Sequence, residues 1–310
     1  MDDLVTLFGG GGFLGRYVAQ ELLRLGARVR IVERDPREAY FLKPLGGLGQ
    51  TQFVAADITK PESVRRAVQG STAVINLVGI LKGRFHDVHV TGARTVAEAA
   101  AAAGAKAFVQ ISAIGADAKA ESAYARSKGE GEAAVRAAFP GATIVRPSIL
   151  FGPEDNFVNR FAQMIARAPV MPVIRGDARF QVAWVVDVAR AIAKAALDPA
   201  SFGGKAFELG GPQTLSMTEI NAWAADAIGS RTRLLALPDS IAGLMARFGF
   251  LPGAPITWNQ WLMLQHDNVV TPGALGFDAF GIDPAPLAAV APKWLVRYRK
   301  HGRFSLSPSA

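Results

Sequence analysis

The sequence contains no cysteine among its 310 residues. Disulfide bonds, thiolate metal sites and cysteine nucleophiles are therefore excluded. The sequence also lacks an unbroken apolar run long enough to cross a membrane, and no basic and apolar leader precedes its first expected strand. We therefore expect a protein without an ordinary signal peptide, on the cytoplasmic side of the membrane.

Histidine and charged residues are also few. The four histidines include His86 and His89 at a spacing of three residues, but no further ligand lies near them in the sequence, so no metal site is expected. The net charge of +8 favours an anionic partner, such as nucleotide phosphates, anionic lipid or an acidic protein face. The arginines are scattered and no nucleic-acid-binding motif is recognisable, so a nucleic-acid partner is not expected.

A glycine cluster follows the first expected strand. Residues 4–8 form an apolar run of strand length, and residues 17–25 have apolar side chains at helical spacing. Between them, Gly9, Gly12 and Gly15 form a GxxGxxG pattern. In a strand–turn–helix unit, such glycines let the backbone approach a pyrophosphate at the positive end of the helix dipole. A purely structural turn is the alternative, but the position ahead of further strand–helix pairs favours dinucleotide binding.

Strand-like and helix-like segments alternate through the first half of the chain. After the glycine cluster, strands are expected at residues 28–32, 52–58, 73–79 and 107–112. This alternation predicts an α/β fold with a Rossmann-type doubly wound parallel sheet.

The alternation loosens after residue 156, which predicts a smaller, mixed C-terminal lobe. We assign residues 1–156 and about 181–200 to a dinucleotide-binding Rossmann domain. Residues 157–180 and 201–310 are assigned to a lobe that faces a substrate or a partner.

The residues expected near the adenosine end of a dinucleotide carry both signs of charge. Glu33 and Arg34 end the second strand, and Arg16 follows the last glycine. An acidic residue here binds the ribose 2′-hydroxyl of NAD, whereas arginine accommodates the 2′-phosphate of NADP. Two guanidinium groups can fork onto a phosphate, which favours NADPH over NADH; solvated surface arginines are the alternative. Asp57 and Ile58 end the third strand, where Asp57 can meet the adenine amino group.

A serine, a tyrosine and a lysine form a candidate catalytic set. Ser112 ends the fifth expected strand, and Tyr124 and Lys128 share one face of the next helix. The lysine ammonium can lower the tyrosine pKa and hold the nicotinamide ribose, while the serine hydroxyl polarises a carbonyl. A solvated helix face is the alternative for an isolated tyrosine–lysine pair. The set can also be vestigial, since a site can outlast its use.

These motifs resemble those of the extended and atypical short-chain dehydrogenase/reductase superfamily. Further matches are residues 145–148, 151–153 and 184–189. By this resemblance, the cofactor would also contact residues after the first, fourth and sixth strands, namely Phe13, Leu14, Leu77, Val78, Gly79, Pro147, Ser148 and Ile149. Extended members usually carry an asparagine at the position of His89, where it supports a proton relay, so the resemblance leaves the relay of this chain unassigned.

A narrower resemblance covers nearly the whole chain. Residues 41–50 (FLKPLGGLGQ), 146–157 (RPSILFGPEDNF) and 265–270 (QHDNVV) resemble segments of the nucleotide-binding accessory subunit of respiratory complex I, the alpha-subcomplex subunit nine family. The alanine-rich and arginine-rich composition and the missing mitochondrial targeting segment resemble a bacterial member.

The narrower resemblance implies a peripheral accessory subunit on the cytoplasmic side of the bacterial inner membrane. Such a subunit holds NADPH tightly, contacts other complex I subunits and has a structural or assembly role, without expected turnover. A free NAD(P)H-dependent reductase, or a nucleotide-sugar epimerase or dehydratase, is the alternative.

A late apolar segment has two interpretations. Residues 238–251 could form an amphipathic helix with an aromatic, methionine-bearing face, and Trp258 and Trp261 add apolar surface nearby. This surface could contact lipid or a partner subunit. Alternatively, it is part of the core of the C-terminal lobe.

Overall fold

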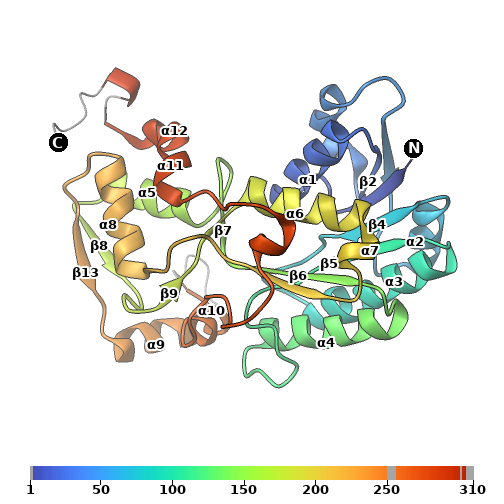
Figure 1. The fold of residues 1–310 in the computed structure, drawn as a ribbon. Helices are drawn as coiled ribbons and strands as arrows, with labels where there is room; N and C mark the ends of the chain where they lie inside the picture. Colours follow the sequence, from blue (N-terminus) through green and yellow to red (C-terminus); the bar gives the residue numbers. More distant parts are fainter. Residues whose placement is uncertain (1–2, 250–255, 301, 305–310) are drawn as a thin grey trace. The chain divides into compact units, whose positions relative to one another are not determined.

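The computed structural model describes residues 3–249, 256–300 and 302–304, and its chain forms two compact units (Figure 1). The first unit extends to Pro147 and also includes Val185–Leu209 and Pro272–Asp283. The second unit consists of Ser148–Trp184, Gly210–Thr271 and the residues from Pro284 onward.

The first unit is built on a seven-stranded parallel sheet with the strand order β11-β6-β5-β4-β1-β2-β3. This order confirms the predicted Rossmann-type doubly wound fold. The strand order reverses between β1 and β4, because β2 and β3 are added on one side of β1 and the later strands on the other. The strands are β1 (Leu4–Phe8), β2 (Arg28–Glu33), β3 (Thr51–Ala55), β4 (Ala73–Asn76), β5 (Ala107–Ile111), β6 (Thr143–Pro147) and β11 (Ala206–Leu209).

Helices cover both faces of this sheet, because each helix has an apolar stripe that is buried against it. In the first helix, Val18 and Leu22 are fully buried one turn apart. One face carries α1 (Phe13–Arg24) and α6 (Val185–Leu197), which pack on each other. The other carries the packed series α2 (Pro61–Val68), α3 (Ala93–Ala102) and α4 (Ala123–Ala138). The first unit also contains the 3₁₀-helices η1 (Pro36–Leu45) and η3 (Phe277–Phe280), the π-helix η2 (His86–Gly92) and the short α7 (Pro199–Phe202).

Two elements of the first unit differ from the sequence-based expectation. The helix after β4, one of the alternating helical segments that the sequence predicts, begins as a π-helix, η2, before α3 continues it; single π-turns inside helices are frequent at functional sites. Strand β11 pairs in parallel with β6, from Ala206 opposite Ile144 to Leu209 opposite Pro147. Residues 206–209 therefore belong to the sheet of the first unit. The sequence-based assignment places all residues from 201 onward in the smaller lobe.

Among its described residues, the second unit has three two-stranded pairs in place of a large sheet. The strands are β7 (Leu150–Phe151), β8 (Val170–Val173), β9 (Arg179–Phe180), β10 (Ala183–Trp184), β12 (Leu215–Ser216) and β13 (Arg233–Ala236). The helices are α5 (Val158–Arg167), α8 (Met217–Ala227), α9 (Asp239–Arg247), α10 (Trp258–Met263), α11 (Leu287–Val290), α12 (Pro292–Leu295), η4 (Val296–Tyr298) and η5 (Gly302–Phe304).

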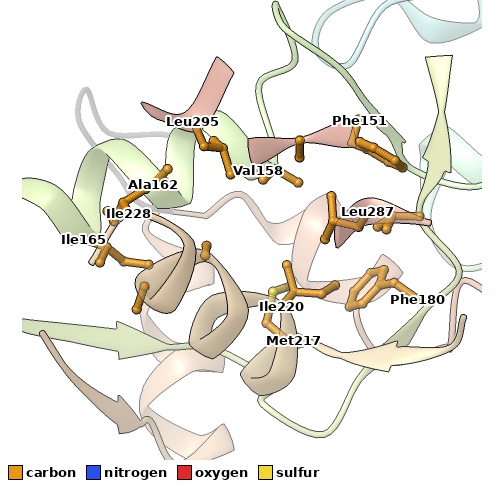
Figure 2. Packing of buried hydrophobic residues seen from close by; sticks show 14 of the residues in the cluster. Phe151, Val158, Ala162, Ile165, Phe180, Met217, Ile220, Ile228, Leu287 and Leu295 are labelled. Carbon is orange, nitrogen blue, oxygen red and sulfur yellow. The ribbon is translucent and has the colours of Figure 1, made fainter. Parts of the chain in front are cut away.

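Figure 2 shows the core of the second unit, where the apolar faces of α5 and α8 meet. On α8, Met217 and Ile220 point into this cluster, and a capping box formed by Ser216 and Glu219 starts the helix. Phe151 and Phe180 close the cluster from the strand side. This core depends on short segments that are far apart in the sequence, which explains why the periodicity loosens here.

The late apolar segment forms α9 and α10, with some apolar side chains buried and others exposed. Contact of the exposed ones with lipid or a partner subunit stays a prediction. Ala242 and Ala246 are buried against Trp261 in a small separate core. On another face of α9, Ile241 and Leu244 are 48% and 58% exposed, and Phe248, which follows the helix, is 52% exposed. Residues 250 and 251 of the expected helix lie outside the described residues. In the part of the chain that the structure describes, no helix is both long enough and apolar enough to span a bilayer.

Candidate dinucleotide site

The glycine turn between β1 and α1 restricts side chains at Gly9 by its backbone conformation and at Gly15 by close packing. Gly9 has φ +79°, a conformation that glycine adopts without strain. A Cβ atom on Gly15 would lie 2.1 Å from the Gly9 carbonyl oxygen, so the first turn of α1 packs directly on the loop. Gly12 is the N-cap of α1, and the first turn contains no acidic residue. This close-packed backbone at a helix N-terminus fits the pyrophosphate of a dinucleotide.

The segment after β4 lies beside this turn. A Cβ atom on Gly9 would contact the backbone of Leu77 and Val78 at 3.4 Å. The Leu77 N–H donates to the Phe8 carbonyl oxygen at 3.0 Å, and the Val78 N–H donates to Asn76 Oδ1 at 3.2 Å. The structure therefore brings the predicted residues at the ends of β1 and β4 together at the carboxyl edge of the sheet, where ligands of such folds bind.

Glu33 makes a contact that the sequence did not reveal. Its Oε1 atom accepts a hydrogen bond from the Gly11 N–H at 2.6 Å, so the acid at the end of β2 braces the glycine turn. Burial raises the pKa of Glu33 above its usual value, against the opposing effect of the Gly11 hydrogen bond. Arg34 beside it is exposed, and the Arg16 guanidinium lies over the ring of Phe41, 4.8 Å from its centroid.

Asp57 and Ile58 have different surroundings although they are adjacent. Asp57 Oδ1 accepts hydrogen bonds from the Thr59 N–H at 2.9 Å and from Thr59 Oγ1 at 2.7 Å. Burial acts to raise the pKa of Asp57, but these hydrogen bonds outweigh it and the pKa lies below its usual value. Ile58 is buried, and a Cβ atom on Gly92 would touch its side chain. Contact of either residue with adenine stays a prediction.

The structure brings the candidate catalytic residues to the ends of β5 and α4. The Lys128 ammonium is buried, donates to the Ile111 carbonyl oxygen at 3.4 Å and lies 5.9 Å from the centroid of the Tyr124 ring. A Cβ atom on Gly79 would lie 3.2 Å from Lys128 Nζ, so the segment after β4 reaches this set. Ser112 is buried, and no hydrogen-bond partner for its Oγ is found among the described residues. A buried hydroxyl of this kind fits a polar group of a ligand.

Burial controls the ionisation of the tyrosine and the lysine. It raises the pKa of Tyr124 to about 12 and lowers the pKa of Lys128 to about 8, against the opposing charge of Glu132. The expected lowering of the tyrosine pKa by the lysine is therefore not seen, because desolvation of the phenolate dominates. Tyr124 therefore keeps its proton at neutral pH, so its hydroxyl can donate a hydrogen bond or act as an acid.

The buried charge of Lys128 should make stability depend on pH. The unfolded chain holds this proton up to a pKa near 10.5, whereas the folded chain releases it near 8. Between these values the unfolded state binds more protons, so the free energy of unfolding rises with pH. We expect the ligand-free Lys128→Met variant to be more stable than the parent protein at pH 7, on the order of a few kcal/mol. The difference should shrink as the pH approaches about 9.5.

Thermal melts between about pH 7 and 9.5 measure this effect, and Lys119→Met is the matched control because Lys119 is exposed on the loop before α4. This control should differ from the parent protein by an amount that is independent of pH. A constant difference for Lys128→Met as well would contradict the prediction.

His89 replaces the asparagine of the superfamily pattern and occupies the π-helix η2. It is 3% exposed, and burial together with the charge of Lys128 lowers its pKa to about 3. The Ile80 N–H donates to its Nε2 atom at 3.0 Å, and its Nδ1 atom lies 2.9 Å from Ser127 Oγ. The sequence marked His89 as a departure from the superfamily pattern and as one of a histidine pair, whereas its two hydrogen-bond partners depend on the fold.

The residues that follow β6 are held by Asn268, which no sequence motif marks as a site residue. Asn268 Oδ1 accepts hydrogen bonds from Ser148 Oγ at 2.6 Å and from the Ile149 N–H at 3.0 Å. Asn268 belongs to the segment 265–270, whose sequence resembles that of the accessory subunit family. Pro147 ends β6 in the first unit, whereas Ser148 and Ile149 begin the second. Contacts of these three residues with a cofactor stay a prediction.

The described part of the chain contains no group of three or more histidine, aspartate and glutamate side chains placed to bind a metal ion.

The chain is similar to several characterised proteins over most of its length. Residues 5–210 match the model of the NAD dependent epimerase/dehydratase family. The chain is 35% identical over 306 residues to NADH dehydrogenase (ubiquinone) 1 alpha subcomplex subunit 9 of Mus musculus, covering 96% of this chain and 81% of that protein. It is 32% identical to the NADH-ubiquinone oxidoreductase 40 kDa subunit of Neurospora crassa, covering 98% and 82%.

Two further similarities concern reductases. A ceramide reductase of Caulobacter vibrioides is 36% identical over 76% of this chain and 74% of its own length. The crystal structure of an NADPH-dependent quinone oxidoreductase from Escherichia coli, complexed with NADPH, superposes with a TM-score of 0.77 at 21% identity, covering 94% of this chain and 99% of that one. At this identity the superposition supports the fold alone. The fold and the family match agree with a nicotinamide dinucleotide at the glycine turn. This chain belongs to the NAD dependent epimerase/dehydratase family, among relatives that include the alpha subcomplex subunit 9 proteins of NADH:ubiquinone oxidoreductase.

Proposed function

We propose that this chain is a peripheral accessory subunit of respiratory complex I that holds NADPH and has a structural or assembly role. The observation that carries the proposal is the similarity to subunits of this enzyme over 96–98% of the chain, which includes both compact units. The glycine turn supports tight dinucleotide binding, because its backbone is closely packed before any ligand arrives. The subunit would lie on the cytoplasmic side of the bacterial inner membrane, with other complex I subunits as its partners.

A pull-down from detergent-solubilised membranes tests this function. We expect the tagged chain to co-purify with complex I subunits, and to release NADPH, identified by mass, only on denaturation. Recovery of the chain without any complex I subunit would contradict the accessory role. Recovery without a dinucleotide would contradict the cofactor-holding role.

The preference for NADPH should depend on Arg34. Its guanidinium is exposed at the end of β2, and the neighbouring Glu33 carboxylate is bound to the Gly11 N–H. Replacing Arg34 with alanine should weaken NADPH binding about tenfold, the usual loss for a charge-assisted hydrogen bond, and should change NADH binding little. Titration of both nucleotides by fluorescence measures this. Arg37→Ala is the control, because Arg37 pairs with Asp35 on the surface. Equal losses for both nucleotides would defeat the assignment to the 2′-phosphate.

The exposed face of α9 is the candidate for contact with the membrane surface. Ile241, Leu244 and Phe248 are about half-exposed at helical spacing. A neighbouring pocket of about 340 Å³ is lined by residues that include Arg247 and Trp258. An apolar helix face with aromatic and basic neighbours fits the interface of an anionic bilayer.

Flotation with vesicles that contain anionic phospholipid tests this contact. Leu244→Ser should bind more weakly than the parent protein, whereas Leu81→Ser, which changes a 68% exposed leucine of the first unit, should not. Equal binding by all three proteins would contradict the membrane contact.

A free reductase is the second candidate function. It is favoured by the buried Ser112 hydroxyl, which has no partner among the described residues, and by the similarity to a ceramide reductase. A bound nicotinamide would supply the hydride, Ser112 could donate a hydrogen bond to a carbonyl, and the protonated Tyr124 could supply the proton. Oxidation of NADPH by a panel of carbonyl compounds, abolished in Tyr124→Phe, would favour this function over the accessory role.

A further inference from the structure

His89 joins three segments of the first unit through hydrogen bonds. The Ile80 N–H, in the segment after β4, donates to His89 Nε2 at 3.0 Å. On α4, Ser127 Oγ lies 2.9 Å from His89 Nδ1 and donates to the Tyr124 carbonyl oxygen at 2.8 Å. The histidine therefore connects the end of β4 to the helix that carries Tyr124 and Lys128.

These contacts are consistent with one arrangement of protons. Because the Ile80 N–H can only donate, Nε2 has no proton, and the neutral ring carries its proton on Nδ1. Ser127 uses its own proton for the Tyr124 carbonyl oxygen and accepts the Nδ1 proton. Both ring nitrogens of His89 and the hydroxyl proton of Ser127 are thus engaged in hydrogen bonds. Neither residue therefore has a free proton to transfer to Lys128.

Close backbone packing holds the ring in this position. A Cβ atom on Gly131 of α4 would lie 2.1 Å from the His89 carbonyl oxygen, so η2 and α4 touch. A Cβ atom on Gly79 would lie 3.6 Å from His89 Nε2. The ring also stacks on Phe85, with 5.6 Å between the centroids, and meets the edge of Tyr124 at 5.5 Å. A rotation of the imidazole would have to displace one of these neighbours.

The charges around the ring oppose a second proton. Lys128 is the ionisable group whose charge acts on His89, and the neighbouring Tyr124 is neutral well above pH 7. Protonation of Nε2 would break the Ile80 hydrogen bond and place a second buried cation near the ammonium of Lys128. The neutral tautomer should therefore persist through the physiological pH range.

We propose that His89 is a positioning residue, which locks the segment after β4 to α4 and holds Tyr124 and Lys128 ready for the nicotinamide end of a dinucleotide, and that it does not relay protons. The dinucleotide in this proposal rests on the proposed function. The link that His89 makes between the segment after β4 and α4, which we call the lock, does not. Asparagine could not make both contacts, because its amide reaches only as far as Nδ1 of histidine. Glutamine has the opposite property, since its amide oxygen reaches the position of Nε2.

This difference gives a matched pair of variants. His89→Asn keeps a donor for Ser127 and loses the acceptor for Ile80, so exchange of the Ile80 amide hydrogen should accelerate at least about fivefold. His89→Gln keeps the acceptor, so Ile80 should exchange at nearly the parental rate. Both variants should release NADPH faster than the parent protein. His86→Gln, a change at an exposed position of the same helix, should alter neither rate.

The ring nitrogens give a second, independent measurement. Nitrogen NMR of the parent protein should show the Nδ1–H tautomer of His89 without titration between pH 5 and 8, and the signal is assigned by its loss in His89→Gln. An Nε2–H tautomer, titration within this range, or unchanged Ile80 exchange in His89→Asn would overturn the lock. Protein purified without a dinucleotide would contradict the proposed function, while amide exchange and NMR would still decide the lock.

Discussion

Replacing Gly15 with alanine is expected to abolish retention of the dinucleotide. The new Cβ atom would lie 2.1 Å from the Gly9 carbonyl oxygen, 2.7 Å from Gly10 Cα and 2.8 Å from the Gly10 carbonyl carbon. All three atoms belong to the backbone, so no side chain can rotate away and the turn must separate from α1. Overpacking of this severity costs about 3 kcal/mol or more, and a similar loss of binding energy corresponds to about 100-fold weaker NADPH binding.

Thermal melts with and without NADPH measure both effects. The parent protein should be stabilised by the nucleotide, because a ligand that binds only the folded state raises the free energy of unfolding. Gly15→Ala should melt earlier and show almost no stabilisation by NADPH. Gly47→Ala is the matched control, since the nearest atom to its Cβ would be the flexible Gln50 amide at 3.7 Å. If NADPH stabilised Gly15→Ala as much as the parent protein, the assignment of the glycine turn as the dinucleotide site would be refuted.

Replacing Arg146 with alanine should cause a large loss of stability in the first unit. Arg146 Nε and Nη2 donate to the two carboxylate oxygens of Glu132 at 2.8 and 2.7 Å, and Nη1 reaches Glu208 at 3.3 Å. The side chain of Glu132 is only 3% exposed and that of Glu208 8%. Removing the guanidinium leaves Glu132 with the half-exposed Arg136 at 3.4 Å. A buried carboxylate that loses its main partner costs about 3–5 kcal/mol.

Urea denaturation followed by circular dichroism measures this loss. Arg65→Ala is the control, because Arg65 and Glu62 form an exposed pair on α2 and such pairs contribute less than about 1 kcal/mol. The double variant Arg146→Met with Glu132→Leu should recover part of the loss, since it removes the buried charge along with its partner. Similar losses for Arg146→Ala and Arg65→Ala would show that water reaches Glu132, contrary to its burial here.

The sequence determined the features that depend on neighbouring residues. Buried strands and amphipathic helices follow from periodicity over a few positions, and so the alternation predicted the parallel sheet correctly. Gly9 and Gly15 could be selected because a tight strand–helix turn tolerates no side chain there. Tyr124 and Lys128 could be paired because helical residues four positions apart share a face. In each case the physical cause acts within one or two turns of chain.

Only the tertiary structure decided how these residues are held and ionised. The Glu33 bond to Gly11 and the Asn268 bond to Ser148 join residues 22 and 120 positions apart, which no local pattern encodes. The sequence left the relay at His89 unassigned, and the fold shows hydrogen-bond partners at both ring nitrogens, because η2 packs against α4. The pKa of Tyr124 rises where proximity to lysine predicted a fall, because desolvation depends on everything that surrounds the hydroxyl. The spacing of residues along the chain was enough to identify the candidate site residues. Their pKa values and hydrogen-bond partners depend on burial and on contacts between distant parts of the chain.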